Sequence, residues 1–374
     1  MEGIVYCIVL LMVATISVSG ETIKSVSFIF GDSLSDIGNN NYFSKALAKA
    51  NYPWYGIDYG NGMPTGRFSN GRTISDIVAE KLGLPVPAAY MSPSTNEDVA
   101  LKQGVNYASG GGGILNETGW LFIQRLSLSR QIELFEGTKF MLTKKIGEER
   151  TEKFLRDSVY LIAIGSNDYI NNYLLPVAAD AWKYSPDDFS DYLISTLRHQ
   201  MTVLHSLGVR KLLFFGLGPL GCIPLQRMQT QDGGCQDNLN QWAVKFNSGT
   251  SKLINDLNSK LPGARFRFGD GLAFFTKLIQ NPQQYGFNNS DTPCCTIGNY
   301  RPTLSCLAAA SLCSDRSKYV FWDEYHPTDA ANVVIAENLM PTLSFGHENT
   351  TTPASAPAPA SLPSPAPSAS PSPS

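Results

Sequence analysis

Charged residues are scarce in this sequence. Asp, Glu, Lys and Arg make up 16% of its 374 residues, and the formal net charge is only −3. No stripe of clustered Lys and Arg is present, which argues against nucleic acid as a partner because phosphate neutralisation requires such clusters. Long apolar runs are also missing: the run at residues 4–18 is short for a membrane span, and no later run is long enough. We therefore expect no stable membrane anchor.

Several catalytic motifs are absent too. There is no HExxH sequence and no His-rich tract, which argues against a metal centre. A GxSxG nucleophile elbow is missing, which disfavours the α/β-hydrolase fold. The segment Gly216–Gly221 matches GxGxxG, but Pro219 lacks the N–H that a phosphate would bind, so nucleotide binding is disfavoured. We expect neither a metal nor another cofactor.

The two ends of the chain differ from the part between them. Residues 1–20 are mostly apolar and end in Val18-Ser19-Gly20, which predicts a secretory signal peptide cleaved before Glu21, with a membrane anchor as the alternative. Among residues 351–374, 21 of 24 are Pro, Ser or Ala, a composition that cannot bury a core. We predict one folded domain at residues 21–346 and a disordered tail at residues 347–374, which is either O-glycosylated or an inert spacer.

Cysteine usage agrees with export. Cys7 leaves with the signal peptide, and the even number that remains predicts three disulfides, at positions 222, 235, 294, 295, 306 and 313. Our preferred pairing joins Cys222 to Cys235. Adjacent Cys294 and Cys295 are expected to bond elsewhere in the chain, since a bridge between neighbours is strained. A zinc site formed by the last four cysteines is less favoured because no CxxC pair is present.

Short β-rich runs recur along the predicted domain, at residues 26–30, 105–108, 159–164, 211–215 and 264–268. Stretches with helical spacing separate most of them, such as residues 187–207, where apolar side chains repeat every three or four positions. Strands that alternate with helices predict right-handed crossovers and a parallel sheet. We therefore predict one α/β domain with its functional groups at the carboxyl ends of the strands.

Polar residues follow these strands. Ser33 comes after the first run, four consecutive glycines at 110–113 come after the second, and Asn167 comes after the third. Near the end of the domain, Asp323 precedes His326 by three residues in one loop. Acyl transfer needs a nucleophile, a base, a group that orients the base, and donors for the oxyanion. Each feature alone is compatible with a turn or a helix cap, but all four together favour catalysis.

Six blocks occur in order along the domain: "FIFGDSLSDIGNNNY", "GRFSNGR", "GVNYASGGGGIL", "IAIGSNDYINNY", "GLGPLGCIP" and "VFWDEYHPTDAAN". In these blocks the sequence resembles the plant GDSL esterase/lipase family of the SGNH hydrolase superfamily. The resemblance implies the SGNH hydrolase fold, a flavodoxin-like three-layer α/β/α arrangement around a parallel five-stranded sheet of order 2-1-3-4-5.

The same resemblance implies roles for the residues that match. Ser33 corresponds to the nucleophile, His326 to the general base, and Asp323 to the group that orients His326. The oxyanion hole would use the Ser33 N–H, the Asn167 side chain and one glycine N–H, from Gly111 or, as second choice, Gly110. Asp32 is expected in a turn or a supporting role, and the asparagines at 39–41 in the hydrogen bonds of the loop.

The expected activity is that of a secreted serine esterase or lipase, which hydrolyses carboxylic esters through an acyl-enzyme. Its ester substrate would be a lipid or an acylated polysaccharide, and its location the cell wall or apoplast, where the tail would associate with the wall. An acyltransferase and a non-catalytic wall-binding protein are the alternatives. Three sequons fit an exported chain as candidate glycosylation sites, at Asn116, Asn288 and Asn349.

Overall fold

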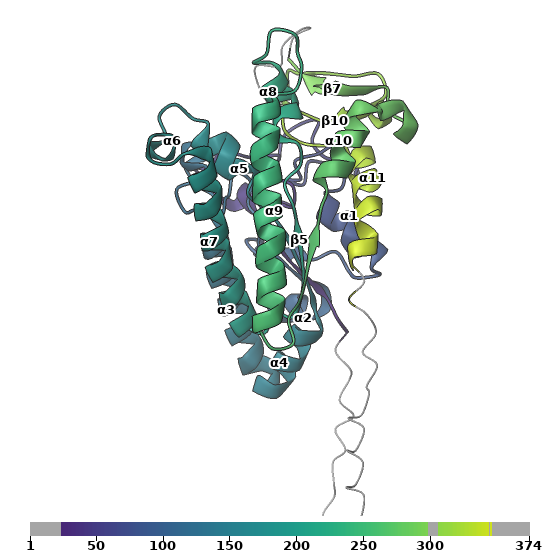
Figure 1. The fold of residues 1–374 in the computed structure, drawn as a ribbon. Helices are drawn as coiled ribbons and strands as arrows, with labels where there is room; N and C mark the ends of the chain where they lie inside the picture. Colours follow the sequence, from purple (N-terminus) through teal and green to yellow (C-terminus); the bar gives the residue numbers. More distant parts are fainter. Residues whose placement is uncertain (1–23, 298–305, 344, 346–374) are drawn as a thin grey trace, which may run out of the picture. The chain divides into compact units, whose positions relative to one another are not determined.

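A parallel sheet of six strands forms the centre of the molecule (Figure 1). The computed structural model describes residues 24–297, 306–343 and 345. In spatial order the strands are β2 (Ala88–Ala89), β3 (Gly104–Asn106), β1 (Ser27–Gly31), β4 (Val159–Ala163), β5 (Lys211–Phe215) and β6 (Arg265–Gly269). The predicted order 2-1-3-4-5 is confirmed by β3, β1, β4, β5 and β6. The predicted number of five is wrong by one, because two alanines at the edge pair with β3.

Apolar residues on both faces explain why these strands occupy the centre. Phe28, Ile29 and Phe30 of β1 are fully buried, as are Leu212, Leu213 and Phe214 of β5. A parallel strand covered by helices on both faces is a continuous apolar run in the sequence, rather than an alternation of apolar and polar residues. All pairs in this sheet are parallel and in unbroken register, with Ser27 of β1 opposite Val159 of β4. The strands therefore end together at one edge.

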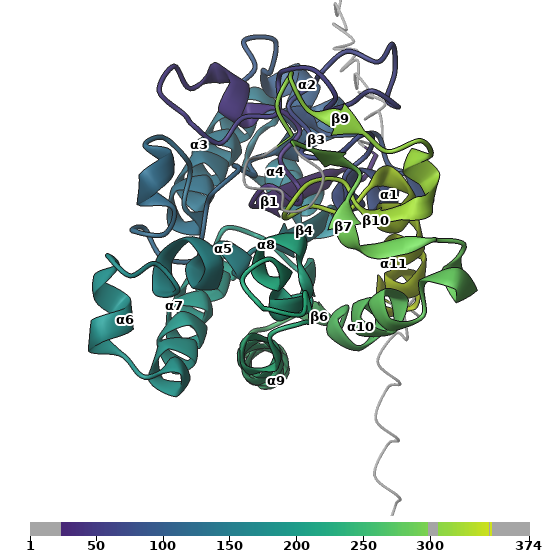
Figure 2. The same ribbon diagram turned by 90° about the horizontal axis from the view of Figure 1, so that it is seen from above.

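Helices cover both faces of the sheet. Figure 2 shows α3, α7 and α9 on one side and α1, α10 and α11 on the other. Their bounds are α1 (Ile74–Lys81), α3 (Leu128–Ile146), α7 (Pro186–Ser206), α9 (Asp237–Lys260), α10 (Leu272–Gln280) and α11 (Asp329–Leu339). The remaining α-helices are α2 (Glu97–Gln103), α4 (Glu148–Asp157), α5 (Ser166–Asp168), α6 (Ala179–Lys183) and α8 (Pro224–Arg227). The predicted three-layer α/β/α fold is confirmed.

Helix α7 illustrates how the sequence sets these elements. Its start is fixed by Ser185, whose side chain accepts a hydrogen bond from the Asp188 N–H, and by Pro186 at the first helical position. The apolar residues that repeat through it are all buried, namely Phe189, Leu193, Leu197, Met201 and Leu204. The helix predicted at residues 187–207 is confirmed to within one residue at each end.

The last part of the domain adds two small sheets beside the central one. Strand β10 (Tyr319–Phe321) pairs in parallel with β7 (Asn289–Pro293), and β8 (Cys295–Thr296) pairs antiparallel with β9 (Ser311–Leu312). The three disulfides join Cys222 to Cys235, Cys294 to Cys313 and Cys295 to Cys306. The predicted Cys222–Cys235 pair and the separate partners of Cys294 and Cys295 are confirmed.

The chain divides into two units, residues 1–344 and 345–374. The predicted signal peptide at residues 1–20, the tail at residues 347–374 and the sequon at Asn349 lie outside the described residues, so these assignments remain predictions. Within the described ranges, no helix combines the length and apolar character needed to cross a membrane.

Candidate active site

Ser33 stands directly after β1, at the carboxyl end of a central strand. A tight turn fixes its position: the Asp32 N–H donates to the Ala163 carbonyl of β4 at 3.0 Å, and the Ser35 N–H donates to the Asp32 carbonyl at 3.1 Å. Gly31, at φ +153°, precedes the turn, where a Cβ would lie 2.4 Å from the Ala163 carbonyl oxygen. The half-buried Ser33 thereby faces a cavity at the sheet edge.

His326 meets Ser33 across this cavity, although 293 residues separate them in sequence. The His326 Nε2 atom lies 2.7 Å from Ser33 Oγ, and Nδ1 lies 2.8 Å from each carboxylate oxygen of Asp323. The Asp323 carboxylate also accepts the backbone N–H groups of Tyr325 and His326, both at 2.8 Å. The three side chains therefore form a continuous hydrogen-bonded chain from carboxylate through imidazole to hydroxyl.

Electrostatics within the pair favour an imidazole that accepts a proton. Burial by itself would lower the pKa of His326, but the adjacent Asp323 carboxylate outweighs burial and raises that pKa above its ordinary value. For Asp323, burial by itself would raise the pKa. The adjacent His326 and the two backbone donors outweigh burial and hold the pKa of Asp323 below its usual range. Asp323 is thus a stable carboxylate that supports an imidazolium when His326 gains a proton.

The glycine loop after β3 offers one backbone donor to the cavity. Gly111 has φ +79° and lines the cavity, and within the described residues neither its N–H nor that of Ser33 has a hydrogen-bond partner. The Gly110 N–H is instead bound to Asp36 Oδ2 at 2.9 Å, and the Gly112 N–H to the Ser109 carbonyl. This geometry favours Gly111 over Gly110 as an oxyanion donor.

Asn167 supplies a side-chain amide on the other side of the cavity, from α5 after β4. Its Nδ2 donates to the Gly112 carbonyl at 3.0 Å, and its Oδ1 accepts from Asn171 Nδ2 at 2.6 Å. An amide nitrogen carries two N–H groups, so one of them stays available to a ligand. The two hydrogen bonds hold the amide in one orientation, with Asn167 lining the same cavity as Ser33 and Gly111.

Buried polar side chains brace the loops around Ser33, as expected for the asparagines. Asn39 Nδ2 donates to the carbonyls of Asn106 and Ala108, and Asn40 Nδ2 donates to the Gly110 carbonyl. On the other side of the glycine loop, the Asp168 carboxylate accepts two backbone N–H groups and the Thr118 hydroxyl, with residues 114 and 115 as the backbone donors. These contacts fix the glycine loop relative to the Ser33 turn.

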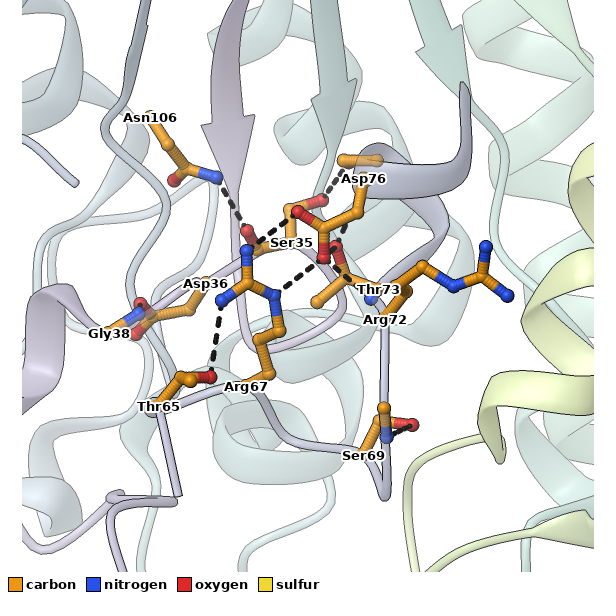
Figure 3. Close-up of polar contacts among 12 residues, drawn as sticks. Ser35, Asp36, Gly38, Thr65, Arg67, Ser69, Arg72, Thr73, Asp76 and Asn106 are labelled. Carbon is orange, nitrogen blue, oxygen red and sulfur yellow. Dashed lines mark hydrogen bonds and ion pairs between the residues drawn. The ribbon is translucent and has the colours of Figure 1, made fainter. Parts of the chain in front are cut away.

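The block "GRFSNGR" clamps the nucleophile turn to the histidine loop. Figure 3 shows the buried Arg67 side chain against the Asp76 carboxylate, with Nε 2.8 Å from Oδ2 and one terminal nitrogen 2.9 Å from Oδ1. Ser35 is held nearby by the Asn106 amide. Further along the block, Ser69 Oγ donates to the Pro327 carbonyl, next to His326. The block therefore supports both sides of the site: Arg67 pairs with Ile37 beyond the nucleophile turn, and the Phe68 ring packs against His326 with 5.2 Å between ring centroids.

Sequence reasoning missed Tyr55, which contacts the candidate triad directly. Its hydroxyl donates to Asp323 Oδ2 at 2.8 Å, and its ring is buried against Phe68 and Trp322. Burial raises the pKa of Tyr55 well above its ordinary value, so the phenol keeps its proton and remains a donor. The aromatic-rich stretch at residues 52–59 was the sole signal in the sequence. It gave no indication of a partner 268 residues away.

Asp32 lies beside the triad without joining it. Its Oδ1 accepts the Leu34 N–H at 3.0 Å, while its buried Oδ2 has no partner among the described residues. Burial raises the pKa of Asp32 to about 7. Asp32 is therefore a second buried carboxyl group beside the site. Unlike Asp323, whose pKa is lowered, Asp32 has a pKa near neutral pH.

The comparisons with known proteins address the family. The sequence profile of the GDSL-like Lipase/Acylhydrolase family matches residues 28–339. The chain belongs to this family. One GDSL esterase/lipase of Arabidopsis thaliana is 55% identical over 340 residues, covering 91% of this chain and 93% of that protein. A second from the same plant is 47% identical over 337 residues, covering 90% and 93%. The predicted family, and with it the class of carboxylic ester hydrolases, is confirmed.

Solved structures give a more distant likeness. An extracellular lipase from Streptomyces rimosus is 13% identical, with a TM-score of 0.36, and the match covers 84% of this chain and 100% of that one.

Of the predicted glycosylation sites, Asn116 and Asn288 are exposed in the structure, and their modification remains a prediction.

Proposed function

We propose that Ser33, His326 and Asp323 act as the nucleophile, the general base and the orienting carboxylate of this GDSL-family ester hydrolase. The observation that carries the proposal is the 2.7 Å contact between Ser33 Oγ and His326 Nε2, with the opposite ring nitrogen bound to Asp323. A base that lies within hydrogen-bond reach of the nucleophile, and is itself held by a third group, is the geometry that acyl transfer requires.

The reaction then runs in two halves. Ser33 Oγ attacks the ester carbonyl carbon while its proton passes to His326 Nε2, and His326 returns that proton to the leaving alkoxide as the C–O bond breaks. Water next attacks the acyl-enzyme carbonyl carbon while giving a proton to His326 Nε2, and His326 returns that proton to Ser33 Oγ as the Ser33–acyl bond breaks and the carboxylic acid leaves. Asp323 stabilises the imidazolium in both halves without becoming protonated.

The oxyanion of each tetrahedral intermediate would be bound by the N–H groups of Ser33 and Gly111 and by the Asn167 amide. All three residues line one cavity, and the two backbone N–H groups are unpartnered within the described residues. Donors that are already oriented lower the barrier because they need no reorganisation as charge develops.

The test compares wild-type protein with Ser33→Ala on p-nitrophenyl esters. We expect the mutation to reduce kcat by at least about 10³-fold, since losing a triad member leaves only binding and the oxyanion donors. A fluorophosphonate probe should label the wild-type protein at Ser33 and leave Ser33→Ala unlabelled. Esterase activity that survives in Ser33→Ala would contradict the assignment. A competing polyol that diverts the product from free acid to a new ester would instead reveal an acyltransferase.

Export to the cell wall forms part of the same proposal. The three disulfides and the exposed sequons Asn116 and Asn288 support an oxidising, extracytoplasmic location. The protein expressed in a plant should lose mass on treatment with an N-glycosidase and should be recovered from the apoplast. Deleting residues 347–374 should lower the fraction that is retained on wall material. Recovery of unglycosylated protein from the cytosol would contradict export.

A further inference from the structure

Tyr52 lines the Ser33 cavity on the side of the base. Its side chain is half-buried, and its ring meets the Tyr55 ring edge-on with 5.4 Å between centroids. The Tyr55 hydroxyl in turn is bound to Asp323. We propose that Tyr52 is a specificity-determining residue, whose hydroxyl donates a hydrogen bond to an oxygen carried by the leaving alcohol. The inference rests on the proposed function, because it assigns the alcohol side of the same reaction.

The hydroxyl of Tyr52 is available to a ligand, because it forms no hydrogen bond with any described residue. Tyrosine hydroxyls in the core do have partners, namely those of Tyr55, Tyr107, Tyr160 and Tyr169. Burial, together with the charges of Asp323 and Glu324, raises the pKa of Tyr52 to about 12, so the phenol keeps its proton and remains a donor. A donor in a cavity that has no protein partner is suited to a ligand oxygen.

The reaction determines which part of the substrate reaches Tyr52. His326 passes a proton to the leaving oxygen, so the alcohol has to lie on the His326 side of the cavity. The carbonyl oxygen is directed instead to the donors of Gly111 and Asn167. Tyr52 belongs to the base side, since Tyr55 contacts both Tyr52 and the carboxylate that orients His326. The alcohol is therefore the part of an ester that Tyr52 contacts.

A strained turn places Tyr52 beside Tyr55. Pro53 is followed by Trp54 at φ +81°, which matches the φ pattern of a type II turn, where the third residue is normally Gly or Asn. Such a turn brings its first and fourth residues together, here Tyr52 and Tyr55. Among the described residues, Trp54 is one of two that have a positive φ without being glycine, a conformation that a Cβ disfavours. Strain of this kind collects at functional sites.

Contacts on both sides of the turn hold this conformation. The Trp54 indole N–H donates to the Ala308 carbonyl at 3.2 Å, in the segment between two disulfide-bonded cysteines. After the turn, the Gly56 N–H donates to the Ser69 carbonyl at 2.9 Å, which joins the turn to the block "GRFSNGR". Trp54 is thus a positioning residue that acts through the tyrosines on either side of it.

The experiment compares 2-hydroxyethyl butyrate with propyl butyrate and measures the ratio of their kcat/KM values by titration of the released acid. A hydroxyl in the first ester replaces the terminal methyl of the second, so the ratio reports recognition of an oxygen on the alcohol. Tyr52→Phe should lower the ratio at least about fivefold, because the substrate hydroxyl loses its partner. Trp54→Gly should lower it about threefold or more, with no further fall when it is added to Tyr52→Phe, since both changes act through one contact.

Matched controls separate recognition by Tyr52 from a general loosening of the site. Tyr59→Phe removes a hydroxyl from the same stretch of chain, at a tyrosine that does not line the cavity. Ile123→Gly relaxes the other positive φ. Tyr325→Phe removes the rival phenol, which lines the cavity beside His326 with 5.8 Å between ring centroids. All three variants should keep the wild-type ratio.

Three results would overturn the role of Tyr52 while leaving the proposed function intact. One is a ratio that Tyr52→Phe does not change. Another is a ratio that falls equally in any of the three control variants. The third is Ser33-dependent hydrolysis of p-nitrophenyl butyrate without turnover of the 2-hydroxyethyl ester. Hydrolysis that persists in Ser33→Ala would instead remove the proposed function itself.

Discussion

The two halves of the candidate site are held in place by different forces. The nucleophile half, Ser33, Gly111 and Asn167, follows the adjacent strands β1, β3 and β4, and buried hydrogen bonds fix its loops. The base half, Asp323 and His326, follows β10, which among the described strands pairs with β7 and not with the central sheet. Disulfides and aromatic rings support that half.

Hydrogen bonds, disulfides and packed rings hold the backbone directly before Asp323. The N–H groups of Cys294 and Cys295 donate to the carbonyls of Phe321 and Trp322, directly before Asp323. Both cysteines are also in disulfides, and Trp322 is fully buried in a cluster with Tyr55. A parallel sheet aligns strand ends through its own register, about 4.8 Å apart. A loop outside the sheet lacks that register, and here cross-links and ring packing position it.

The largest effect should come from the nucleophile half. Asn167→Ala removes one oxyanion donor, and we expect kcat to fall about 10²–10³-fold with KM little changed, because the lost interaction forms mainly in the transition state. Steady-state kinetics on a p-nitrophenyl ester give both constants. Asn172→Ala is the control, since Asn172 is bonded to Asp180 and does not line the cavity. Equal losses in both variants would contradict the role of Asn167.

The next effect concerns the covalent support of the base half. Replacing Cys295 and Cys306 together by serine should lower the free energy of unfolding by about 2–4 kcal/mol. Because Cys295 of β8 donates to the Trp322 carbonyl directly before Asp323, activity should disappear at a lower urea concentration than global unfolding in this variant. The two transitions should coincide in wild-type protein. Coincident transitions in the variant would show that the Cys295–Cys306 disulfide stabilises the fold without positioning the base.

A smaller effect is expected from Tyr55→Phe. The mutation removes the hydroxyl bound to Asp323, which should lower kcat about tenfold, the worth of a hydrogen bond to a charged group. The Asp323 charge then acts more strongly on His326, so the pKa of His326 rises and the acidic limb of the pH profile moves to higher pH. Tyr160→Phe is the control, because its buried hydroxyl donates to the Leu155 carbonyl. An unmoved acidic limb in Tyr55→Phe would reduce Tyr55 to a packing residue.

The smallest effect should come from Asp32→Asn. It should shift the acidic limb of the pH profile in the direction opposite to the shift in Tyr55→Phe. The pKa of Asp32 is about 7, so near neutral pH part of its population is charged and helps raise the pKa of His326. The neutral amide removes that contribution, and the acidic limb of kcat/KM should move to lower pH. The rate on the plateau should stay within a few-fold of wild type. A shift toward higher pH would contradict this electrostatic coupling.

Much of this protein could be predicted from its sequence because the signals are local. The apolar runs predicted five of the six central strands, and the apolar repeats at residues 187–207 predicted α7. The Cys222–Cys235 pair spans only 13 residues, so proximity in sequence favoured it. The blocks around Ser33, Asn167 and His326 predicted the family. The missed strand, Ala88–Ala89, has only two residues and directly follows Pro85 and Pro87, and prolines argue against a strand.

The sequence by itself determined the elements, the family and the candidate residues, because capping, apolar periodicity and motif spacing act over a few positions. Only the tertiary structure decided which groups meet: the Tyr55 hydroxyl with Asp323, the Gly110 N–H with Asp36, which leaves Gly111 as the glycine that lines the cavity, and the residue 216–221 segment with α10 and α11 along that cavity. Those contacts join residues up to hundreds of positions apart. Their geometry follows from how sheet, helices and cross-linked loops pack together, which local patterns do not encode.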